Sequence, residues 1–209
     1  MICMSHLLRI KIYFGLKVRF KQPLYFFILI NILLWSCASK NNYHLAELDP
    51  ERFILLKDSL LSINRHDGVI SAFTGAHNSI GEKAILDKDY KTAIKQFSLA
   101  LELSPTDSTS RYNLYMAEGH SIYNSSKRKK LWDAIDKYDS ASRIKPKSGE
   151  PHYYIGETYL KISDRDFDLI IESYDRALSL QLDPLLKIIV LERKKHEQER
   201  QNKYEKFWR

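Results

Sequence analysis

Hydrophobic residues follow two different patterns along the chain. Near the N-terminus they form one nearly continuous stretch of 12 residues, Leu24–Trp35. From about residue 49 onward, apolar positions recur at helical spacing among charged residues, the pattern of amphipathic helices. Only 6 Pro and 7 Gly occur in 209 residues, a composition that also favours helix. The sequence therefore predicts an all-α domain that follows an apolar leader.

Small and aromatic residues recur at matching spacings in three segments of this domain. In the first two segments an Ala-x3-aromatic-x2-Ala pattern on a second helix is followed by a proline. The third segment has Ile170 in place of the first alanine, and its proline, Pro184, comes two places late. The residues that we assign to packing between helices are Gly81, Ala93, Phe97, Ala100, Ala134, Tyr138, Ala141, Gly156, Tyr159, Tyr174 and Ala177.

This pattern resembles the tetratricopeptide repeat (TPR), which has a period of ~34 residues and the signature Leu-Gly-x2-Tyr, Ala-x3-Phe, Ala, Pro. The resemblance implies a TPR-like helical solenoid of about three helix-turn-helix repeats, expected over 74–107, 108–148 and 149–184. In such repeats a small residue on the first helix lets the second helix approach, and an aromatic residue fills the space between neighbours.

The middle repeat departs from the pattern. Ala100 and Ala141 are separated by 41 residues, seven more than one period, and we place the extra residues in Tyr123–Lys130, between the two helices. Tyr115 stands where the small residue of the signature is expected. The sequence therefore predicts that this helix pair is splayed.

Two Asp-Pro pairs mark the flanking helices, because they place an N-cap acceptor before a proline at the first helical position. Asp49-Pro50 predicts a helix to about Asn64 within an N-terminal helical segment, 49–73. Asp183-Pro184 predicts a C-terminal capping helix, 185–209. The early half of that helix is apolar enough to cover the last repeat, and its later half is charged, as the exposed end of a solenoid requires.

The apolar stretch Leu24–Trp35 reads as part of a targeting signal. As a helix it would span roughly 18 Å, well short of the ~30 Å hydrocarbon core of a bilayer, but its length and basic flank suit a signal peptide, 1–36. Leu34-Trp35-Ser36-Cys37 resembles the lipobox of bacterial lipoproteins. The resemblance implies that Cys37 receives a diacylglyceryl thioether and becomes the N-terminus after cleavage.

Lipidation would hold the domain on a membrane, because two or three acyl chains anchor a protein stably. Residues 37–48 would then be the lipidated cysteine and a small, polar tether. Ala38 is not the aspartate that signals inner-membrane retention in enterobacterial lipoproteins. We expect a lipid-anchored protein of the bacterial cell envelope, on the outer membrane and facing the periplasm.

The formal net charge of +7 and the pI of about 9.2 do not indicate nucleic-acid binding. Residues 1–36 carry five of the basic residues and no acid; without them 28 Lys and Arg face 26 Asp and Glu, a net charge of +2. Because the basicity belongs mostly to the targeting segment, the sequence predicts no nucleic-acid partner. Lys127–Lys130 is a local basic cluster for which two interpretations stay open: a solvated turn, or, in a membrane-tethered protein, a contact with anionic headgroups or an acidic partner.

No catalytic or metal-binding constellation is found in the sequence. None of the 7 histidines forms a His-x3-His pair, and a single lipidated cysteine leaves no thiol ligands for zinc. The alternating acids of Asp164–Asp168 lack the glycine of a calcium loop, since Leu169 takes its place, and helix capping is the better interpretation. We therefore predict a protein that is not an enzyme and holds no cofactor or metal.

Binding is expected on the first helices of the repeats, since the TPR resemblance implies a concave groove for peptides there. By repeat position the groove residues are Asn78, Glu82, Tyr112, Met116, Tyr153 and Glu157. Tyrosines anchor interfaces well because they bury a large area at little entropic cost, but ordinary packing at a repeat junction is an equally good interpretation.

The function that follows is a scaffold that recruits an envelope protein or peptide, as an outer-membrane assembly factor or as an adaptor for cell-wall enzymes. The alternative is a lipoprotein that binds a small ligand, a glycan or a peptidoglycan fragment, through the same tyrosines.

Overall fold

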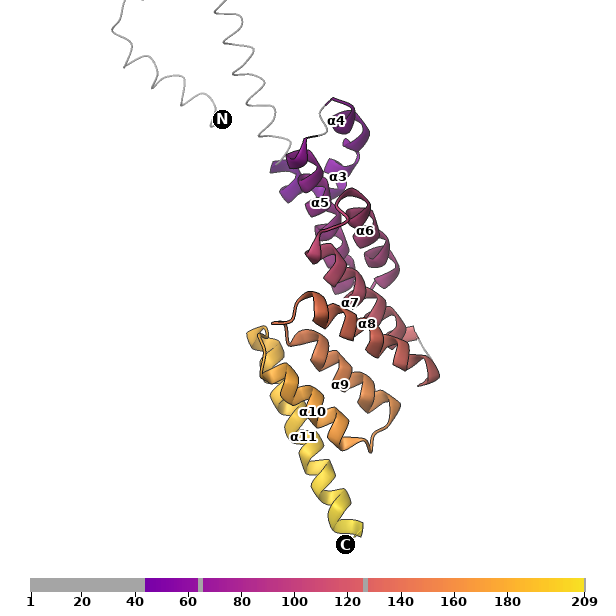
Figure 1. Cartoon of the computed structure of the whole chain (residues 1–209), viewed down its shortest axis with the longest axis vertical. Helices are drawn as coiled ribbons and strands as arrows, with labels where there is room; N and C mark the ends of the chain where they lie inside the picture. The colour runs from indigo at the N-terminus through magenta and orange to yellow at the C-terminus, as the bar shows by residue number, and fades with distance from the viewer. Residues whose placement is uncertain (1–43, 64–65, 126–127, 209) are drawn as a thin grey trace, which may run out of the picture. The chain divides into compact units, whose positions relative to one another are not determined.

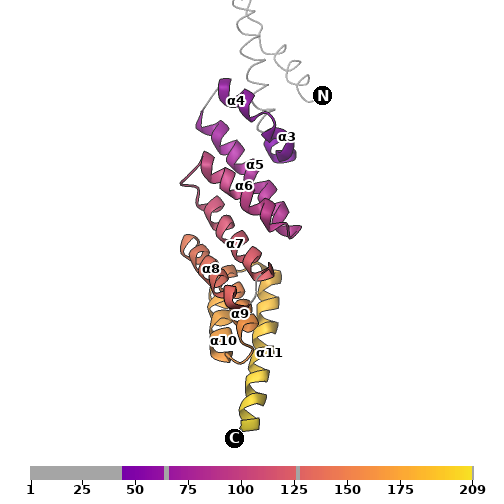
Figure 2. The same ribbon diagram turned by 90° about the vertical axis from the view of Figure 1, so that its right-hand side faces the viewer.

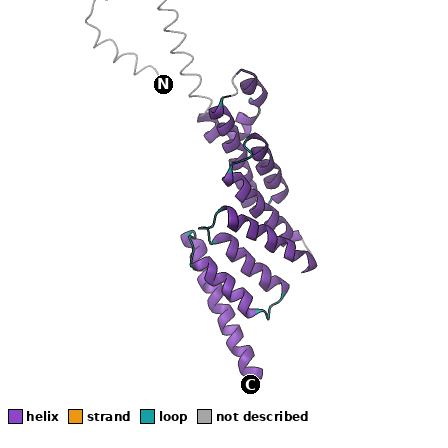
Figure 3. Cartoon of the chain, in the orientation of Figure 1, coloured by secondary structure: helices purple, strands orange, loops and turns teal. Residues whose placement is uncertain are grey.

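A computed structural model of the protein describes residues 44–63, 66–125 and 128–208. The chain divides into two units, Met1–Tyr43 and His44–Arg209, and the described residues belong to the second. They are almost entirely helical and include no β-strand, only an isolated bridge between Ser148 and Gln181 (Figure 3). The predicted all-α class is therefore confirmed.

The helices of the second unit follow one another in chain order (Figures 1 and 2). They are α3 (Pro50–Ile54), α4 (Lys57–Ile63), α5 (Asp67–Leu86), α6 (Tyr90–Leu103), α7 (Ser108–Ser125), the 3₁₀ helix η1 (Arg128–Lys130), α8 (Leu131–Ile144), α9 (Glu150–Ile162), α10 (Phe167–Leu178) and α11 (Pro184–Trp208). Helix α5 packs against α6, α7 against α8 and α9 against α10, and each pair also packs against the helix that follows it. The unit is thus built from successive neighbours in the chain.

In each of the three helix pairs, a glycine on the first helix faces an aromatic ring on the second. An ideal Cβ atom on Gly81 would lie 2.5 Å from Cε1 of Phe97, one on Gly119 would lie 2.5 Å from Cε1 of Tyr138, and one on Gly156 would lie 2.6 Å from Cε1 of Tyr174. No side chain fits at these positions, so glycine permits the close approach.

The middle pair is not splayed, which corrects the prediction made from Tyr115. Gly119 is the small residue of this pair, four positions after the one that a period of 34 residues selects. Because four residues make about one helical turn, Tyr115 and Gly119 lie on nearly the same side of α7. The insertion therefore does not lie wholly between the helices, since about four of its residues, close to one turn, precede Gly119.

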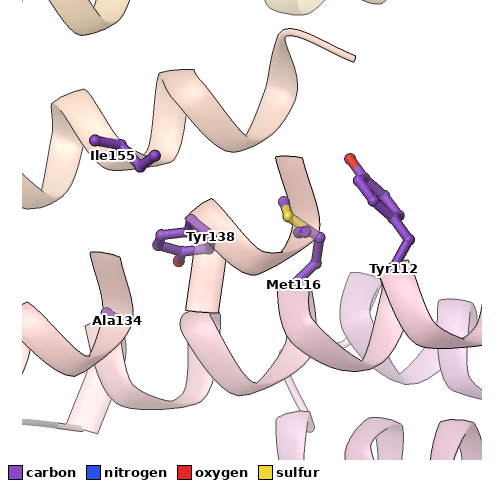
Figure 4. Close-up of a cluster of buried hydrophobic side chains, with 6 residues drawn as sticks. Tyr112, Met116, Ala134, Tyr138 and Ile155 are labelled. Atoms are coloured by element: carbon purple, nitrogen blue, oxygen red, sulfur yellow. The ribbon is translucent and has the colours of Figure 1, made fainter. Parts of the chain in front are cut away.

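Buried side chains form a series of clusters rather than one central core. Phe53 and Phe73 stack in the first cluster, with ring centroids 4.4 Å apart. A second cluster surrounds Phe97, and the last surrounds Tyr174. Between these two, the cluster in Figure 4 joins Tyr112 and Met116 of α7, Ala134 and Tyr138 of α8 and Ile155 of α9. The five alanines expected at helix contacts, Ala93, Ala100, Ala134, Ala141 and Ala177, are fully buried.

The N-terminal part of the unit differs from the prediction in three ways. Residues 44–48 are helical and Ala46 is buried against Phe53 and Phe73, so the end of the segment 37–48 is folded structure and not tether. The predicted helix to Asn64 is broken into α3 and α4. Its predicted start is correct: the Asp49 carboxylate caps α3 by accepting a hydrogen bond from the backbone N–H of Arg52. The expected boundary at residues 73 and 74 falls inside α5, which is continuous from Asp67.

The C-terminal helix α11 begins at Pro184, and the backbone N–H of Leu185 donates to the Asp183 carboxylate. Its early half covers the last pair less than predicted. Val190 is fully buried, but Leu185 and Ile188 are mostly exposed. Only one side of the helix contacts α10, and the other apolar side chains of this stretch face away from the contact.

Candidate functional site

The glycine in each first helix defines which positions are equivalent. Three residues before it stand Asn78, Met116 and Tyr153, and one residue after it stand Glu82, His120 and Glu157. The repeat positions used to predict the groove treat Tyr112 and Tyr153 as equivalent, and the glycines show that they are not. The error arose because Tyr115, which lies one helical turn before Gly119, was aligned with Gly81 and Gly156.

The residue after the glycine accepts or shares a hydrogen bond with the aromatic hydroxyl of the second helix. In the middle pair, Nδ1 of His120 lies 2.9 Å from the hydroxyl of Tyr138. In the third pair, the hydroxyl of Tyr174 donates to Oε1 of Glu157 at 2.6 Å. The first pair has Phe97, which lacks a hydroxyl, at this place. Glu82, the residue after the glycine in this pair, therefore has no aromatic hydroxyl to bond on α6 and bonds to α7 instead.

Glu82 lies at the edge of a cavity of about 340 Å³ between α5 and α7, near the start of α9. The side chain of Asn113 on α7 donates to Oε1 of Glu82 at 3.0 Å and links the two helices there. The residues lining the cavity are Glu82, Ile85, Leu86, Phe97, Tyr112, Asn113, Met116, His120 and Glu150. Apolar side chains and a few hydrogen-bonding groups thus share one hollow, the usual make-up of a binding pocket.

The polar side of the cavity is organised around Tyr112. Its hydroxyl donates to Oε2 of Glu150 at 2.9 Å and lies 3.2 Å from the hydroxyl of Ser148. Nζ of Lys145 stands 4.3 Å from the centre of the Tyr112 ring. Burial, and secondly the charge of Glu150, raise the pKa of Tyr112 above its usual range, so the phenol stays protonated and remains a donor.

Two further titratable groups of the cavity are shifted by burial. Burial raises the pKa of Glu150, against the opposing effects of the Tyr112 hydrogen bond and of Lys145. Burial also lowers the pKa of His120 to about 4. His120 sits among aromatic rings, with its centroid 4.4 Å from that of Tyr154 and 5.5 Å from that of Tyr138. At neutral pH it is therefore an uncharged imidazole.

The structure brings together three of the predicted groove residues, Glu82, Tyr112 and Met116, at the cavity. Tyr112 and Met116 are buried there, so they form its wall and are not free-standing anchors.

The other three groove residues lie elsewhere. Asn78 accepts a hydrogen bond from the hydroxyl of Ser110 at 2.9 Å. Tyr153 is buried in the cluster that includes Val190 of α11, and Glu157 lies 3.6 Å from Nε of Arg193. The predicted groove is consequently covered by α11 over the third pair, because this helix packs on α10 and its Val190 and Arg193 reach Tyr153 and Glu157 of α9.

Five residues of the cavity were missed in the sequence: Ile85, Leu86, Asn113, His120 and Glu150. The signal that could have found His120 is the motif Ala117-Glu118-Gly119-His120, once Gly119 is aligned with Gly81 and Gly156. No local pattern signals Glu150, since it reaches the cavity only through the packing of α9 against α7 and α8.

No protein-family model matches the chain, and no curated protein matches it. The site is therefore interpreted from its own residues.

Other site predictions concern metals and the membrane. Within the described residues, no group of three His, Cys, Asp or Glu side chains is arranged to hold a metal ion. Asp166 precedes α10, but its side chain does not cap the helix. Asp164 pairs with Arg200 and Asp168 accepts a hydrogen bond from Gln201, so Asp164 and Asp168 contact α11.

None of the described helices is long and apolar enough to span a membrane. Cys37 lies outside the described residues.

Proposed function

We propose that the chain is a membrane-anchored scaffold of the bacterial envelope, in which TPR-like repeats hold another protein. In this proposal the cavity between α5 and α7 receives part of the partner. Cys37 carries the lipid anchor, and the helical unit faces the periplasm from the outer membrane.

The spacing of the three helix pairs supports the TPR-like assignment. Gly81, Gly119 and Gly156 follow one another at 38 and 37 residues, close to the ~34 of a TPR. Each glycine faces an aromatic ring of the second helix of its pair, as the repeat requires. Stacking of this kind places all first helices side by side and leaves a shared face on which partners dock.

The observation that carries the binding proposal is the composition of the cavity wall. Ile85, Phe97 and Met116 provide an apolar surface, and Asn113 and Glu82 provide hydrogen-bonding groups beside it. An apolar side chain of a partner could enter this hollow while its neighbouring backbone bonds to the rim. Outer-membrane assembly factors and cell-wall enzymes are the classes of partner that fit the proposed location.

Leu86 offers a direct test because it lines the cavity and is 82% exposed, so replacing it does not disturb the core. We expect a photo-crosslinking residue at position 86 to capture one protein in intact cells. The matched control is position 55, a leucine that is 83% exposed and does not line the cavity. Crosslinking of the same proteins from both positions, or from neither, would contradict the proposal.

A second candidate, binding of a small glycan, is favoured by the size of the cavity. Its volume of about 340 Å³ lies at the lower end of the range of roughly 300–1,000 Å³ found for small-molecule sites. If crosslinking fails at position 86, while a fragment of peptidoglycan raises the melting temperature of the parent but not of an Asn113→Ala variant, this second candidate replaces the first.

A further inference from the structure

A cationic corner lies where α7, η1, α8 and α9 meet. We define it by Arg128, Lys129 and Lys130 of η1, Trp132 of α8 and Lys161 of α9. The three side chains of η1 are exposed. This part of the middle insertion plays no role in the proposed partner site, since none of its residues lines the cavity.

Two cations of this corner fix it to the rest of the unit. Nε of Arg128 donates to the backbone carbonyl of Ile162 at the end of α9. Lys161 donates to the carbonyl of Tyr123 near the end of α7, and its Nζ lies 4.4 Å from the centre of the Tyr123 ring. Cations at the C-terminal ends of helices are favoured by the helix dipole. The contacts explain Arg128 and Lys161 as structural residues and hold η1 in place.

The same contacts do not explain Lys129, Lys130 and Trp132. Among the described residues, no acid forms an ion pair with either lysine. Trp132 is 51% exposed and contacts the edge of Tyr159, with ring centroids 6.0 Å apart. Segment 128–133 contains three cations and one acid, Asp133. The corner therefore presents two exposed lysines, not paired with any acid among the described residues, close in the chain to a large exposed indole.

We propose that this cationic corner contacts the anionic surface of a phospholipid bilayer, with Lys129 and Lys130 at the phosphates and Trp132 in the interfacial layer. Charge complementarity favours an anionic surface, and an exposed tryptophan beside lysines is the combination found at membrane interfaces. The inference rests on the proposed membrane attachment through Cys37. In that proposal the protein is held at a lipid surface, in a compartment without nucleic acid. A lipid chain and a basic patch together anchor more firmly than either alone.

The test follows the fluorescence of Trp132 in the full chain, in a Trp35→Phe, Trp208→Phe background that leaves one tryptophan. We expect a blue shift, and quenching by brominated lipids, with vesicles that contain phosphatidylglycerol but not with purely zwitterionic vesicles. Each lysine near an anionic surface strengthens binding about fivefold. Lys129→Gln with Lys130→Gln should therefore weaken the response to anionic lipid about 25-fold, and high salt should suppress it in the parent.

The control variant is Lys187→Gln with Lys195→Gln, which removes two exposed lysines of α11 and should leave the response unchanged. Vesicle flotation of the same samples separates the two levels of the proposal. If the chain floats with vesicles but Trp132 does not respond, the corner does not contact lipid and the inference is wrong, while membrane attachment stands. If the chain does not float at all, both fail. An equal response to zwitterionic vesicles, or a response only to an acidic polypeptide or an oligonucleotide, would also overturn it.

Discussion

At the scale of single residues, the glycines of the first helices matter for the space they leave rather than for their backbone freedom. No glycine among the described residues has a positive φ angle. Gly81, Gly119 and Gly156 lie within helices, where glycine is unfavourable relative to alanine. They are accommodated because an aromatic ring occupies the volume that a Cβ atom would take.

This explanation predicts opposite effects for two glycine-to-alanine substitutions. Gly119→Ala should destabilise the unit by about 1–3 kcal/mol, because the new methyl group would overlap the Tyr138 ring. Gly75→Ala in α5 meets no atom within 4 Å and should stabilise it by about 0.5–1 kcal/mol through helix propensity. Urea unfolding of both variants checks the prediction. Similar values for the two would mean that the Gly119 contact is not tight.

The buried imidazole of His120 predicts a dependence of stability on pH. Its pKa is lowered from 6.5 to about 4 in the folded state, so the unfolded state binds the proton more tightly. The stability that this group contributes is fully present above about pH 6.5 and falls as the pH falls toward 4. We expect a loss of about 2 kcal/mol between pH 7 and pH 5 from this residue.

A His120→Gln variant provides the comparison, because an amide can bond to the Tyr138 hydroxyl but does not titrate. Urea unfolding at pH 7 and pH 5 should show a smaller loss for the variant than for the parent. Both proteins keep His77 and His152, whose pKa values are also lowered by burial, so the difference isolates His120. Equal losses would show that His120 is protonated in the folded state at pH 5.

At the scale of elements, α11 contains a buried ion pair of its own, and its Arg200 also joins it to the third helix pair, beside the apolar contacts. Glu197 is 1% exposed. Its Oε2 lies 2.5 Å from Nη1 of Arg200, and its Oε1 lies 2.9 Å from Nδ1 of His196. Arg200 also reaches the backbone carbonyl of Asp164 at 3.0 Å. The charged later half of α11 is thus not wholly an exposed cap, because one of its acids, Glu197, is buried.

Removing the arginine should therefore cost more than removing an exposed charge. Arg200→Gln leaves the buried carboxylate of Glu197 with only His196 beside it, and we expect a loss of about 2–3 kcal/mol. Lys203→Gln, three residues later on the exposed surface of the same helix, should change stability by less than about 0.5 kcal/mol. Thermal or urea unfolding measures both. A negligible loss for Arg200→Gln would indicate that solvent reaches Glu197.

Helix α7 shows how an insertion can be absorbed without loss of packing. The first helices of the outer pairs present Gly81 and Gly156 to their partners, and α7 presents Gly119, about one turn later than a period of ~34 residues from Gly81 would place it. Because a full turn returns the chain to nearly the same side of the helix, the residues facing α8 keep their character. An insertion of two residues would have rotated them away from the contact.

At the scale of the whole molecule, the proposed function depends on the lipid anchor, which can be tested separately from the helical unit. Cells supplied with labelled palmitate should label the protein, and Cys37→Ala should abolish the label and prevent processing. Ser39→Ala, a change in the same segment that removes no thiol, serves as the control and should be labelled normally. Labelling that survives Cys37→Ala would rule out the lipobox interpretation.

The sequence by itself determined the helical class, the positions of the two Asp-Pro helix starts and the aromatic and alanine positions of the helix pairs. These features depend on local spacing and capping, which neighbouring residues decide. Only the tertiary structure decided that Gly119 and not Tyr115 is the residue that lies against the Tyr138 ring of α8. Both residues satisfy the helical pattern, and only the position of the Tyr138 ring distinguishes them.

The cavity depended on tertiary structure for the same physical reason. Glu150 and Glu82 are 68 residues apart in the chain, and they line one hollow because α5, α7 and α9 stack side by side. Tyr153 looked equivalent to Tyr112 in the sequence, yet α11 covers it. Whether a polar or aromatic side chain faces solvent, a cavity or another helix depends on which elements pack against it, and no local pattern encodes that packing.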